Sequence, residues 1–291
     1  MIDGGTIGKT TRRAARDGLS VVGAVVLILL LANPDAHGLD ARGYWSFDPA
    51  NPYREAFGNL NALTAFRYAP PIALAFMPLQ VLPWVPWITL WTLVQFAALL
   101  FLTRRWALAA LAFYPVAMEV SAGNVNLLIG VAVVAGFRWP AAWSFVLLTK
   151  ISPGVGLVSF AVRREWRPLV IAAAATFLAC VLAAVVRPEL FAQWFEMLRA
   201  DVGLEPDGLH VPVPLWVRVV GAATLVAWGA RTNRRWTVLV GATLALPTIW
   251  TAGTSMLVGL VALARERGPA KPSGTGPSPV DGQGAASSRA R

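Results

Sequence analysis

Residues 40–71 read DARGYWSFDPANPYREAFGNLNALTAFRYAPP and form the first long polar segment of the chain. The segment carries acids, arginines and aromatic residues, and it ends in Pro70-Pro71 at the start of the next apolar run. Proline is tolerated in the first turn of a helix because its missing N–H has no intrahelical partner there. We therefore interpret the segment as a loop between two apolar helices. The rest of the chain decides on which face of a membrane this loop lies.

The composition is that of an integral membrane protein. Of the 291 residues, 56% are hydrophobic and 14% are charged, and the mean hydropathy is +0.58. Soluble globular domains carry about 25% charged residues, so this deficit, with many long apolar runs, excludes an ordinary soluble domain. We expect an all-α polytopic membrane protein with about ten transmembrane helices, within a range of roughly eight to eleven.

The net charge of +10 does not indicate a nucleic-acid partner. The basic residues fall in short clusters between apolar runs, which is how membrane topology signals are spaced. The single cysteine, Cys180, excludes an internal disulfide. The two histidines, His37 and His210, lie in different polar segments, and no Cys/His cluster has metal-ligand spacing. We therefore expect no structural zinc and no other cofactor, and the sequence indicates no metal requirement, although the acids near the site leave one open.

Charge also predicts the domain organisation. Residues 1–18 are expected to be a basic cytoplasmic tail, residues 19–265 an integral membrane domain, and residues 266–291 a disordered cytoplasmic tail rich in Gly, Pro and Ser. Lys and Arg are more frequent in the inner segments of this ten-span topology, and acids in the outer ones. The prediction is a multi-pass protein of the cell membrane with a cytoplasmic N-terminus and outer segments at residues 33–69 and 187–214.

One basic pair disagrees with this topology. The first three spans are expected at about residues 19–32, 70–82 and 87–102. Arg104-Arg105 would then lie outside. Either these arginines have a function there, or a short helix near Pro70 has been miscounted as a span.

Two later segments have their own signatures. Residues 191–198 read as an amphipathic helix lying at the membrane interface. Residues 236–264 are long enough for one tilted helix or for two short helices bent at Pro247, and we prefer the two short helices.

Lys150 is the most informative residue within an apolar run. A charge at the centre of a membrane helix costs roughly 2.5–3.5 kcal/mol on insertion scales. Such a lysine either reaches an interface with its long side chain, forms an internal ion pair, or has a function. Pro153 breaks the helix nearby, and the freed carbonyl groups are candidate acceptors for the ammonium group.

Asp40 precedes the aromatic pair Tyr44-Trp45 by about one helical turn. An aspartate in a partly desolvated position has raised basicity and can act as a general base. The alternative is an ordinary loop acid or helix N-cap, and the residue type alone favours this alternative.

Other polar residues leave two interpretations open. Arg42, Arg54 and Arg67 have side chains suited to a phosphate, but they equally fit a solvated loop face. Glu119, Asn124 and Asn126 interrupt an apolar region, and a polar turn between two helices is their simpler explanation.

Four motifs together resemble a known family. They are DARGYW at residues 40–45, FRYAPPIALAFMPLQVLPW at 66–84, GNVNLL at 123–128 and LLTKISPG at 147–154. In this order they resemble glycosyltransferase family 87, which comprises polyprenol-phosphate-mannose-dependent mannosyltransferases and their relatives. The resemblance runs over residues 40–250 and implies the polytopic GT-C fold with an outer-face loop bearing the site.

The resemblance also implies a reaction. A hexose, expected to be mannose, would pass from a polyprenyl-phosphate donor to a glycolipid or glycan acceptor at the outer face, with inversion and with Asp40 as general base. Arg67, Lys150 and Arg42 would face the donor phosphate. The remaining residues expected to bind substrate are Tyr44, Tyr68, Asn124 and Asn126.

One departure from the family keeps other functions open. Many members carry a histidine near a C-terminal Pro/Trp motif, whereas residues 246–253 contain none. His210 could replace it only if its loop folds back over the site. The alternatives are a transporter or flippase, which broken helices and an intramembrane lysine would suit, and a catalytically inactive relative that binds lipid.

Overall fold

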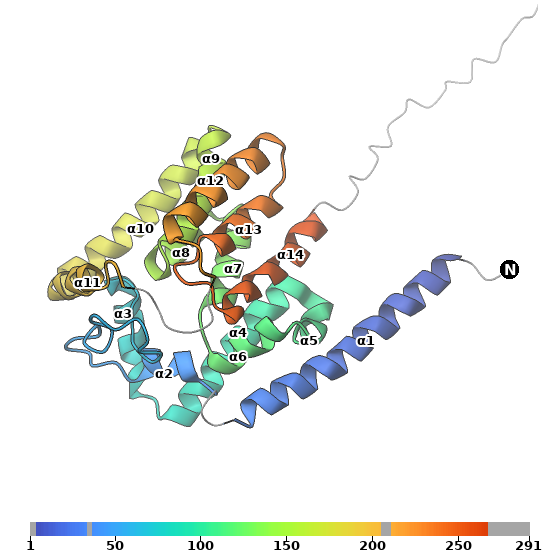
Figure 1. Cartoon of the computed structure of the whole chain (residues 1–291), viewed down its shortest axis with the longest axis horizontal. Coiled ribbons are helices and arrows are strands. Elements are labelled where there is room, and N and C mark those ends of the chain that lie inside the picture. Colours follow the sequence, from blue (N-terminus) through green and yellow to red (C-terminus); the bar gives the residue numbers. More distant parts are fainter. Residues whose placement is uncertain (1–3, 34–36, 205–210, 267–291) are drawn as a thin grey trace, which may run out of the picture.

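The computed structural model describes residues 4–33, 37–204 and 211–266, and all regular elements in this part of the chain are helical (Figure 1). Of residues 4–9 and 266 only the backbone is described. The expectation of an all-α membrane protein is confirmed for the described ranges.

In the described part of the chain, three helices are apolar and long enough to cross a membrane: α1 (Gly4–Leu31), α4 (Trp84–Thr103) and α10 (Trp166–Val186). About 20 residues are needed for this length, at 1.5 Å per residue. Helices α6 (Tyr114–Ala122) and α7 (Asn126–Ala135) are bent by 109° relative to each other, and as one broken span they raise the number to four.

Helices α1 and α10 carry the clearest sign of lipid contact. Only 11% of the most apolar window of each is buried within the protein, although the mean hydropathy of these windows is 2.0 and 2.8. In water such apolar surfaces would cause aggregation, whereas in a bilayer they face acyl chains. The structure is therefore that of a helical membrane protein.

The expected number of about ten spans is not reached among the described residues, because most apolar runs there are divided into short helices. Proline removes a backbone hydrogen bond and obstructs the preceding turn, and Pro153 and Pro247 lie at two of the breaks. The remaining elements are α2 (Leu39–Trp45), α3 (Pro70–Phe76), η1 (Met77–Val81), η2 (Arg104–Trp106), α5 (Ala107–Ala110), η3 (Pro140–Ala142), α8 (Trp143–Thr149), η4 (Ser152–Leu157), α9 (Val158–Val162), α11 (Glu189–Ala200), α12 (Leu215–Arg231), α13 (Trp236–Leu244), η5 (Thr251–Val258) and α14 (Gly259–Glu266).

The expected second span at residues 70–82 does not cross from one end of the molecule to the other. Helix α3 follows directly on the first loop (residues 37–69), and η1 returns to that loop. The indole Nε1 of Trp45 donates to the Leu82 carbonyl at 2.8 Å, and Gln80 Nε2 donates to the Phe47 carbonyl at 3.0 Å. The segment begins and ends against the same loop, so it was miscounted as a span.

Helix α4 then leads away from the first loop, and this corrects the expected position of Arg104-Arg105. The guanidinium group of Arg265, in the last turn of α14, donates to the Leu102 carbonyl at 2.6 Å, and Arg104 interacts with it electrostatically. Arg104 therefore lies at the end of the molecule where α14 leads into the C-terminal tail. The basic pair no longer opposes the charge pattern of the chain.

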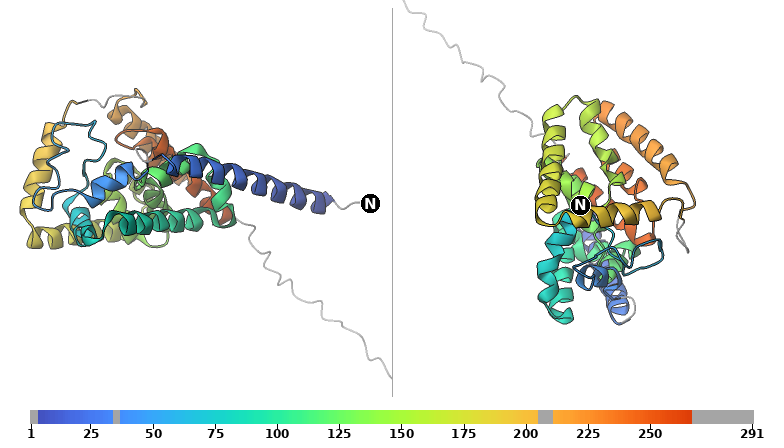
Figure 2. Two further views of the ribbon diagram at one scale, coloured as in Figure 1. Left: turned by 90° about the horizontal axis from the view of Figure 1, so that it is seen from below. Right: turned by 90° about the vertical axis from the view of Figure 1, so that its left-hand side faces the viewer.

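Helix α10 runs between two ends of the molecule. Glu165 precedes its first turn, and Arg187 follows its last turn and donates to the carbonyl of Pro49 in the first loop at 3.4 Å. On α11, Gln193 Nε2 donates to the Ala50 carbonyl at 3.1 Å. Figure 2 shows α11 and the first loop together at the end away from the N-terminus. The expected helix at residues 191–198 is present within α11, and it fastens the loop.

The C-terminal part follows the expectation of two short helices. Helix α13 ends at Leu244, and the chain resumes its helical course in η5 and α14. Arg218 donates to the carbonyl groups of Leu244, Leu246 and Pro247 at 3.0, 2.5 and 2.7 Å. These bonds satisfy the carbonyl groups that a broken helix leaves without intrahelical partners.

Candidate active site

The candidate site is built around the bend between α6 and α7. Gly123 ends α6 in the left-handed region, with φ of 77°. A Cβ atom at this position would lie 2.8 Å from the Ala41 Cβ. Trp91 Nε1 donates to the Gly123 carbonyl at 2.6 Å. Glycine is needed here for its backbone conformation, and its lack of a side chain brings α2 against the bend.

Glu119 joins the two sides of this bend. It is fully buried, and its Oε1 accepts the backbone N–H of Asn126 at 2.6 Å while its Oε2 accepts Asn126 Nδ2–H at 2.9 Å. The N–H of Leu127 approaches the same carboxylate at 3.4 Å. The first N–H groups of a helix have no intrahelical acceptor, so Glu119 caps the start of α7.

Lys150 reaches the bend from the end of α8. Its Nζ donates to Asn126 Oδ1 at 2.7 Å and approaches Asn124 Oδ1 at 3.4 Å. Helix α8 stops at Thr149, and Lys150 takes an extended backbone conformation. The lysine side chain therefore meets two amide oxygens within the protein, and Glu119 and Asp40 supply negative charge around it.

Asp40 approaches from the first loop. It lies on the first turn of α2, which is fixed to α6 because the Gly38 N–H donates to the Ser121 carbonyl at 2.7 Å. Burial raises the pKa of the Asp40 carboxyl above its ordinary value of 3.8, and a hydrogen bond with the Asn124 side chain and the positive charge of Lys150 offset part of this rise. A carboxylate held in this way is a stronger base than an exposed one.

Aromatic side chains form a wall beside Asp40. The hydroxyl groups of Tyr44 and Tyr68 lie 2.8 Å apart, and the Tyr44 ring stacks on Phe76 at a centroid distance of 5.2 Å. Trp91 meets Tyr44 edge to face at 5.7 Å. Burial raises the pKa of both tyrosines, so they stay neutral and remain hydrogen-bond donors.

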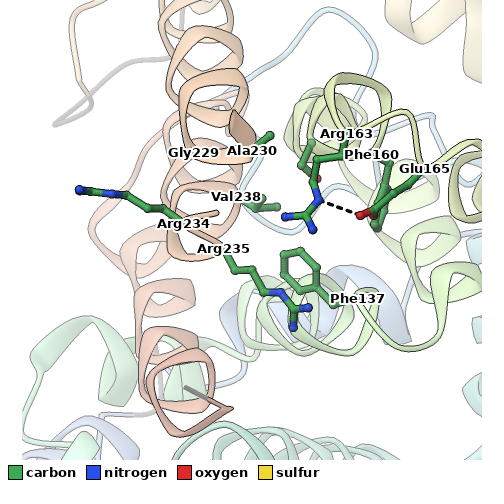
Figure 3. Close-up of a pocket in the computed structure, with 10 residues that line it drawn as sticks. Phe137, Phe160, Arg163, Glu165, Gly229, Ala230, Arg234, Arg235 and Val238 are labelled. Carbon is green, nitrogen blue, oxygen red and sulfur yellow. Dashed lines mark hydrogen bonds and ion pairs between the residues drawn. The ribbon is translucent and has the colours of Figure 1, made fainter. Parts of the chain in front are cut away.

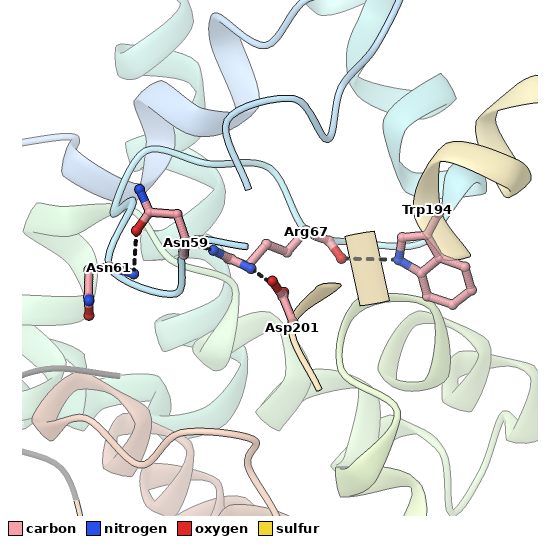
Figure 4. Close-up of polar contacts among 5 residues, drawn as sticks. All are labelled: Asn59, Asn61, Arg67, Trp194 and Asp201. Atoms are coloured by element: carbon pink, nitrogen blue, oxygen red, sulfur yellow. Dashed lines mark hydrogen bonds and ion pairs between the residues drawn. The ribbon is translucent and has the colours of Figure 1, made fainter. Parts of the chain in front are cut away.

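The two arginines expected near the phosphate have other partners. Arg67 Nη1 forms an ion pair with Asp201 Oδ2 at 2.7 Å, and its Nη2 donates to the Asn59 carbonyl (Figure 4). Arg42 is exposed and lies over the Trp84 ring at 5.1 Å. The structure thus brings Asp40, Tyr44, Tyr68, Asn124, Asn126 and Lys150 together around the bend, and it gives Arg67 and Arg42 contacts of their own.

Three residues that contact the predicted site residues were not predicted from the sequence to do so. Glu119 was interpreted as part of a polar turn, although a carboxylate seven residues before Asn126 can cap the following helix. Gln95 is fully buried on α4 and donates to the Asn124 carbonyl. A glutamine within an apolar helix is a signal for such a contact. Asp201 is distant in sequence, and nothing in the pattern pairs it with Arg67.

Other candidate groups lie elsewhere. His210 falls outside the described residues, as do residues 267–291 of the expected tail. Within the described ranges, no three His, Cys, Asp or Glu side chains are grouped so that they could hold a metal ion. A cavity of about 360 Å³ next to Trp106 and another of about 50 Å³ next to Arg163 are not lined by Asp40 or Lys150.

The comparison with known families decides the classification. The sequence model of glycosyltransferase family 87 matches residues 66–265, more than half of the chain. The chain belongs to glycosyltransferase family 87. The family 87 match contains Arg67, Tyr68, Asn124, Asn126 and Lys150, and Asp40, Arg42 and Tyr44 precede it. No curated protein and no solved structure shows significant similarity to this family 87 chain. Family membership and the apolar helices together identify a membrane glycosyltransferase.

Proposed function

We propose that this protein transfers a hexose, mannose in the first instance, from a polyprenyl-phosphate donor to a hydroxyl group of a glycolipid or glycan. The reaction takes place beside the α6–α7 bend, with Asp40 as general base. The observation that supports this most is that Asp40 and Lys150 approach the same amide, Asn124, from different elements. A carboxylate and an ammonium group thus approach one amide beside the bend.

In the proposed reaction, Asp40 assists formation of the new glycosidic bond and Lys150 assists cleavage of the bond to the phosphate. Asp40 takes the proton from the acceptor hydroxyl as its oxygen forms a bond to the anomeric carbon of the sugar. The bond between that carbon and the phosphate oxygen breaks from the opposite side, which inverts the configuration. The lipid phosphate leaves with the bonding electrons, and the Lys150 ammonium stabilises the negative charge that develops on it. Asp40 ends protonated and returns its proton to water.

Lys150 is the preferred phosphate partner in this proposal. Arg67 is already paired with Asp201 and Arg42 lies exposed over Trp84, whereas Lys150 lies at the bend beside Asn124 and Asn126. Asn124 and Asn126 orient the lysine, and the Tyr44 and Tyr68 hydroxyl groups are available to sugar hydroxyls. In an apolar environment such preorganised groups act more strongly than they do in water.

The site is proposed to open at the outer face of the cell membrane, with the N-terminus in the cytoplasm. Arg104 and Arg265 share the end of the molecule that leads to the C-terminal tail, and positively charged segments favour the cytoplasmic side. The first loop comes after the C-terminal end of α1, so it lies at the end of α1 opposite the N-terminus. An acceptor from the aqueous outside and a donor from the lipid would then meet at Asp40.

The test is transfer of radiolabelled mannose from polyprenyl-phosphate mannose in proteoliposomes that contain the purified protein. Asp40→Asn keeps the size and removes the base, and we expect it to lower the transfer rate about 10²–10⁴-fold. Lys150→Met is expected to have a comparable effect. The matched control is Asp48→Asn, because Asp48 is an exposed acid of the same loop that only accepts the Ala50 N–H at 2.9 Å.

An unchanged rate in Asp40→Asn would refute the assignment of the base. Absence of transfer with every polyprenyl-phosphate sugar offered, in protein that is folded, would refute the proposed donor. The same proteoliposomes can be assayed for movement of the labelled lipid between leaflets, and movement without transfer would indicate a flippase.

A further inference from the structure

Gln95 is a fully buried amide within α4, a largely apolar helix that is long enough to cross a membrane. Its Nε2 donates to the Asn124 carbonyl. The opposite orientation of the amide would turn Oε1 toward that carbonyl oxygen, so chemistry fixes the orientation. In the described part of the chain, Gln95 Oε1 is buried and accepts no hydrogen bond. The residue thus makes one side-chain contact and leaves a buried oxygen unsatisfied, which lowers stability.

Trp91 and Gln95 together hold the α6–α7 bend. They lie one turn apart on the same face of α4. Trp91 Nε1 donates to the Gly123 carbonyl at 2.6 Å, and Gln95 donates to the next carbonyl along the chain. Both carbonyls follow the last turn of α6, where carbonyl groups have no intrahelical donor. Helix α4 therefore fixes two successive peptide groups at the bend.

The side chain of Asn124 depends on this backbone. Its Oδ1 accepts the Val125 N–H at 2.7 Å, and Lys150 Nζ approaches the same oxygen at 3.4 Å. The Asn124 side chain also forms a hydrogen bond with Asp40. Because an ionised carboxylate can only accept, that bond uses the Asn124 Nδ2–H. A rotation of the Asn124 backbone would therefore move the amide away from Asp40.

We propose that Gln95 is a positioning residue for the transfer reaction, because it holds the Asn124 backbone and thereby keeps the Asn124 amide hydrogen-bonded to Asp40. This inference rests on the proposed function and adds a residue of α4 to it. Gln95 acts through Asn124 and not on the reacting atoms.

The expected consequence concerns the proton affinity of Asp40. Burial raises the pKa of Asp40, and the hydrogen bond from Asn124 and the charge of Lys150 offset part of this rise. A loosened Asn124 should therefore raise the pKa of Asp40 further. The other titratable groups that interact with Asp40 are Glu119, Tyr44 and Tyr68. Replacement of Gln95 leaves all of these groups in the protein.

The experiment follows the titration of Asp40 by ¹³C NMR in the purified full-length protein, labelled at the aspartate carboxyl carbons. The Asp40 signal is the one that disappears in Asp40→Asn. The test variants are Gln95→Leu, Asn124→Ala and the combination of both. The transfer rate of each variant is measured over the same pH range.

Two controls separate this role from general effects. Thr103→Val removes another buried polar group of α4, since the Thr103 hydroxyl donates only within its own helix, to the Leu99 carbonyl at 2.6 Å. Glu165→Gln removes a carboxylate that pairs with Arg163 at 2.7 Å beside a separate cavity (Figure 3). Both controls should leave the titration of Asp40 unchanged.

In Gln95→Leu we expect the midpoint of the Asp40 titration to move to higher pH, in the same direction as in Asn124→Ala. The transfer rate on the acid side of the profile should fall about three- to tenfold. In the combined variant, Gln95→Leu should add nothing to the effect of Asn124→Ala, because no amide remains to be positioned. The melting temperature of Gln95→Leu should change little, since the variant removes one unsatisfied oxygen and creates another at the Asn124 carbonyl.

A wild-type titration of Asp40 in Gln95→Leu would overturn the inference, and so would equal shifts with and without the Asn124 side chain. The proposed function fails on a different result. If Asp40→Asn transfers sugar at the wild-type rate, Asp40 is not the base, yet the titration still shows whether Gln95 positions Asn124. If Gln95→Leu does not fold, Gln95→Met removes the same donor with an unbranched side chain, and the same outcomes decide.

Discussion

The carboxylate of Glu119 fixes the orientation of the Asn126 amide. Glu119 Oε2 accepts the Asn126 Nδ2–H at 2.9 Å, and this leaves the Asn126 Oδ1 facing Lys150 Nζ at 2.7 Å. A carboxylate can only accept hydrogen bonds and an ammonium group can only donate them. The amide between them therefore has a single orientation that satisfies both neighbours, and Lys150 is positioned through Glu119 without touching it.

Replacement of Glu119 should lower the unfolding free energy by more than the loss of its side-chain volume alone would. In Glu119→Ala the buried N–H and Nδ2 groups of Asn126 lose their acceptors, and bonds to a charged group contribute about 1.5–3 kcal/mol each. We expect a loss of about 3–5 kcal/mol of unfolding free energy, measured by thermal or denaturant unfolding in detergent. The control is Glu189→Ala, since Glu189 is an acid at the exposed end of α11. Similar stability of the two variants would contradict the role of Glu119.

The transfer rate should depend on pH through Asp40. Only the ionised carboxylate accepts a proton, so the rate should fall tenfold per pH unit below the pKa, which burial raises above 3.8. The raised value also means that the folded protein binds this proton more tightly than the unfolded chain. The contribution of Asp40 to stability is therefore largest at low pH and declines as pH rises through the raised pKa. The residual transfer rate of Asp40→Asn should not fall at low pH. If its rate falls at low pH as in the wild type, Asp40 is not the group that causes the fall.

Variants of the ion pair between Arg67 and Asp201 can distinguish a role of Arg67 in fastening the first loop from a role in binding the donor phosphate. If the arginine mainly fastens the first loop, Arg67→Ala and Asp201→Ala should lower transfer to a similar degree. Their coupling in a double-mutant cycle should be about 1 kcal/mol, because both side chains are partly accessible. A phosphate ligand would behave differently. Arg67→Ala would then reduce kcat/KM far more than Asp201→Ala, and this result would restore Arg67 to the donor site.

Two glycines offer a matched test of the close contact at the bend. Gly123→Ala places a methyl group in the left-handed region and 2.8 Å from the Ala41 Cβ, and we expect a cost of about 1–3 kcal/mol together with reduced transfer. Gly221→Ala lies within α12 with no atom within 4 Å of the added Cβ, and it should be neutral or stabilise by about 0.5–1 kcal/mol. Equal melting temperatures would show that α2 does not need to lie so close to the bend.

Much of the helical framework could be predicted because apolar runs and their basic ends are local signals. The helix at residues 87–102 and the two helices on either side of Pro247 correspond to α4 and to α13 with α14. The span at residues 70–82 was wrong because composition shows that a segment is apolar and not where its two ends go. Trp45 and Gln80 hold those ends to the first loop, and nothing in the sequence marks them for these contacts.

The site could be predicted only in part for a similar reason. Lys150 stood out because a charge within an apolar run is costly, whereas Asp40 was singled out by the family resemblance. Glu119 did not stand out, since a polar turn explains it equally well until Asn126 is seen to face it. The pairing of Arg67 with Asp201 joins residues 134 positions apart, and sequence spacing carries no information about it.

The 109° bend between α6 and α7 has an electrostatic consequence. It turns the start of α7 toward the interior, so the positive end of that helix's macrodipole lies beside Lys150 rather than in solvent. The Glu119 carboxylate accepts the first N–H groups of α7 and neutralises much of this partial charge. An anion that binds beside the bend would therefore interact both with the ammonium group and with the remaining dipole of α7. The direction of this short helix is fixed by Gly123 and Glu119.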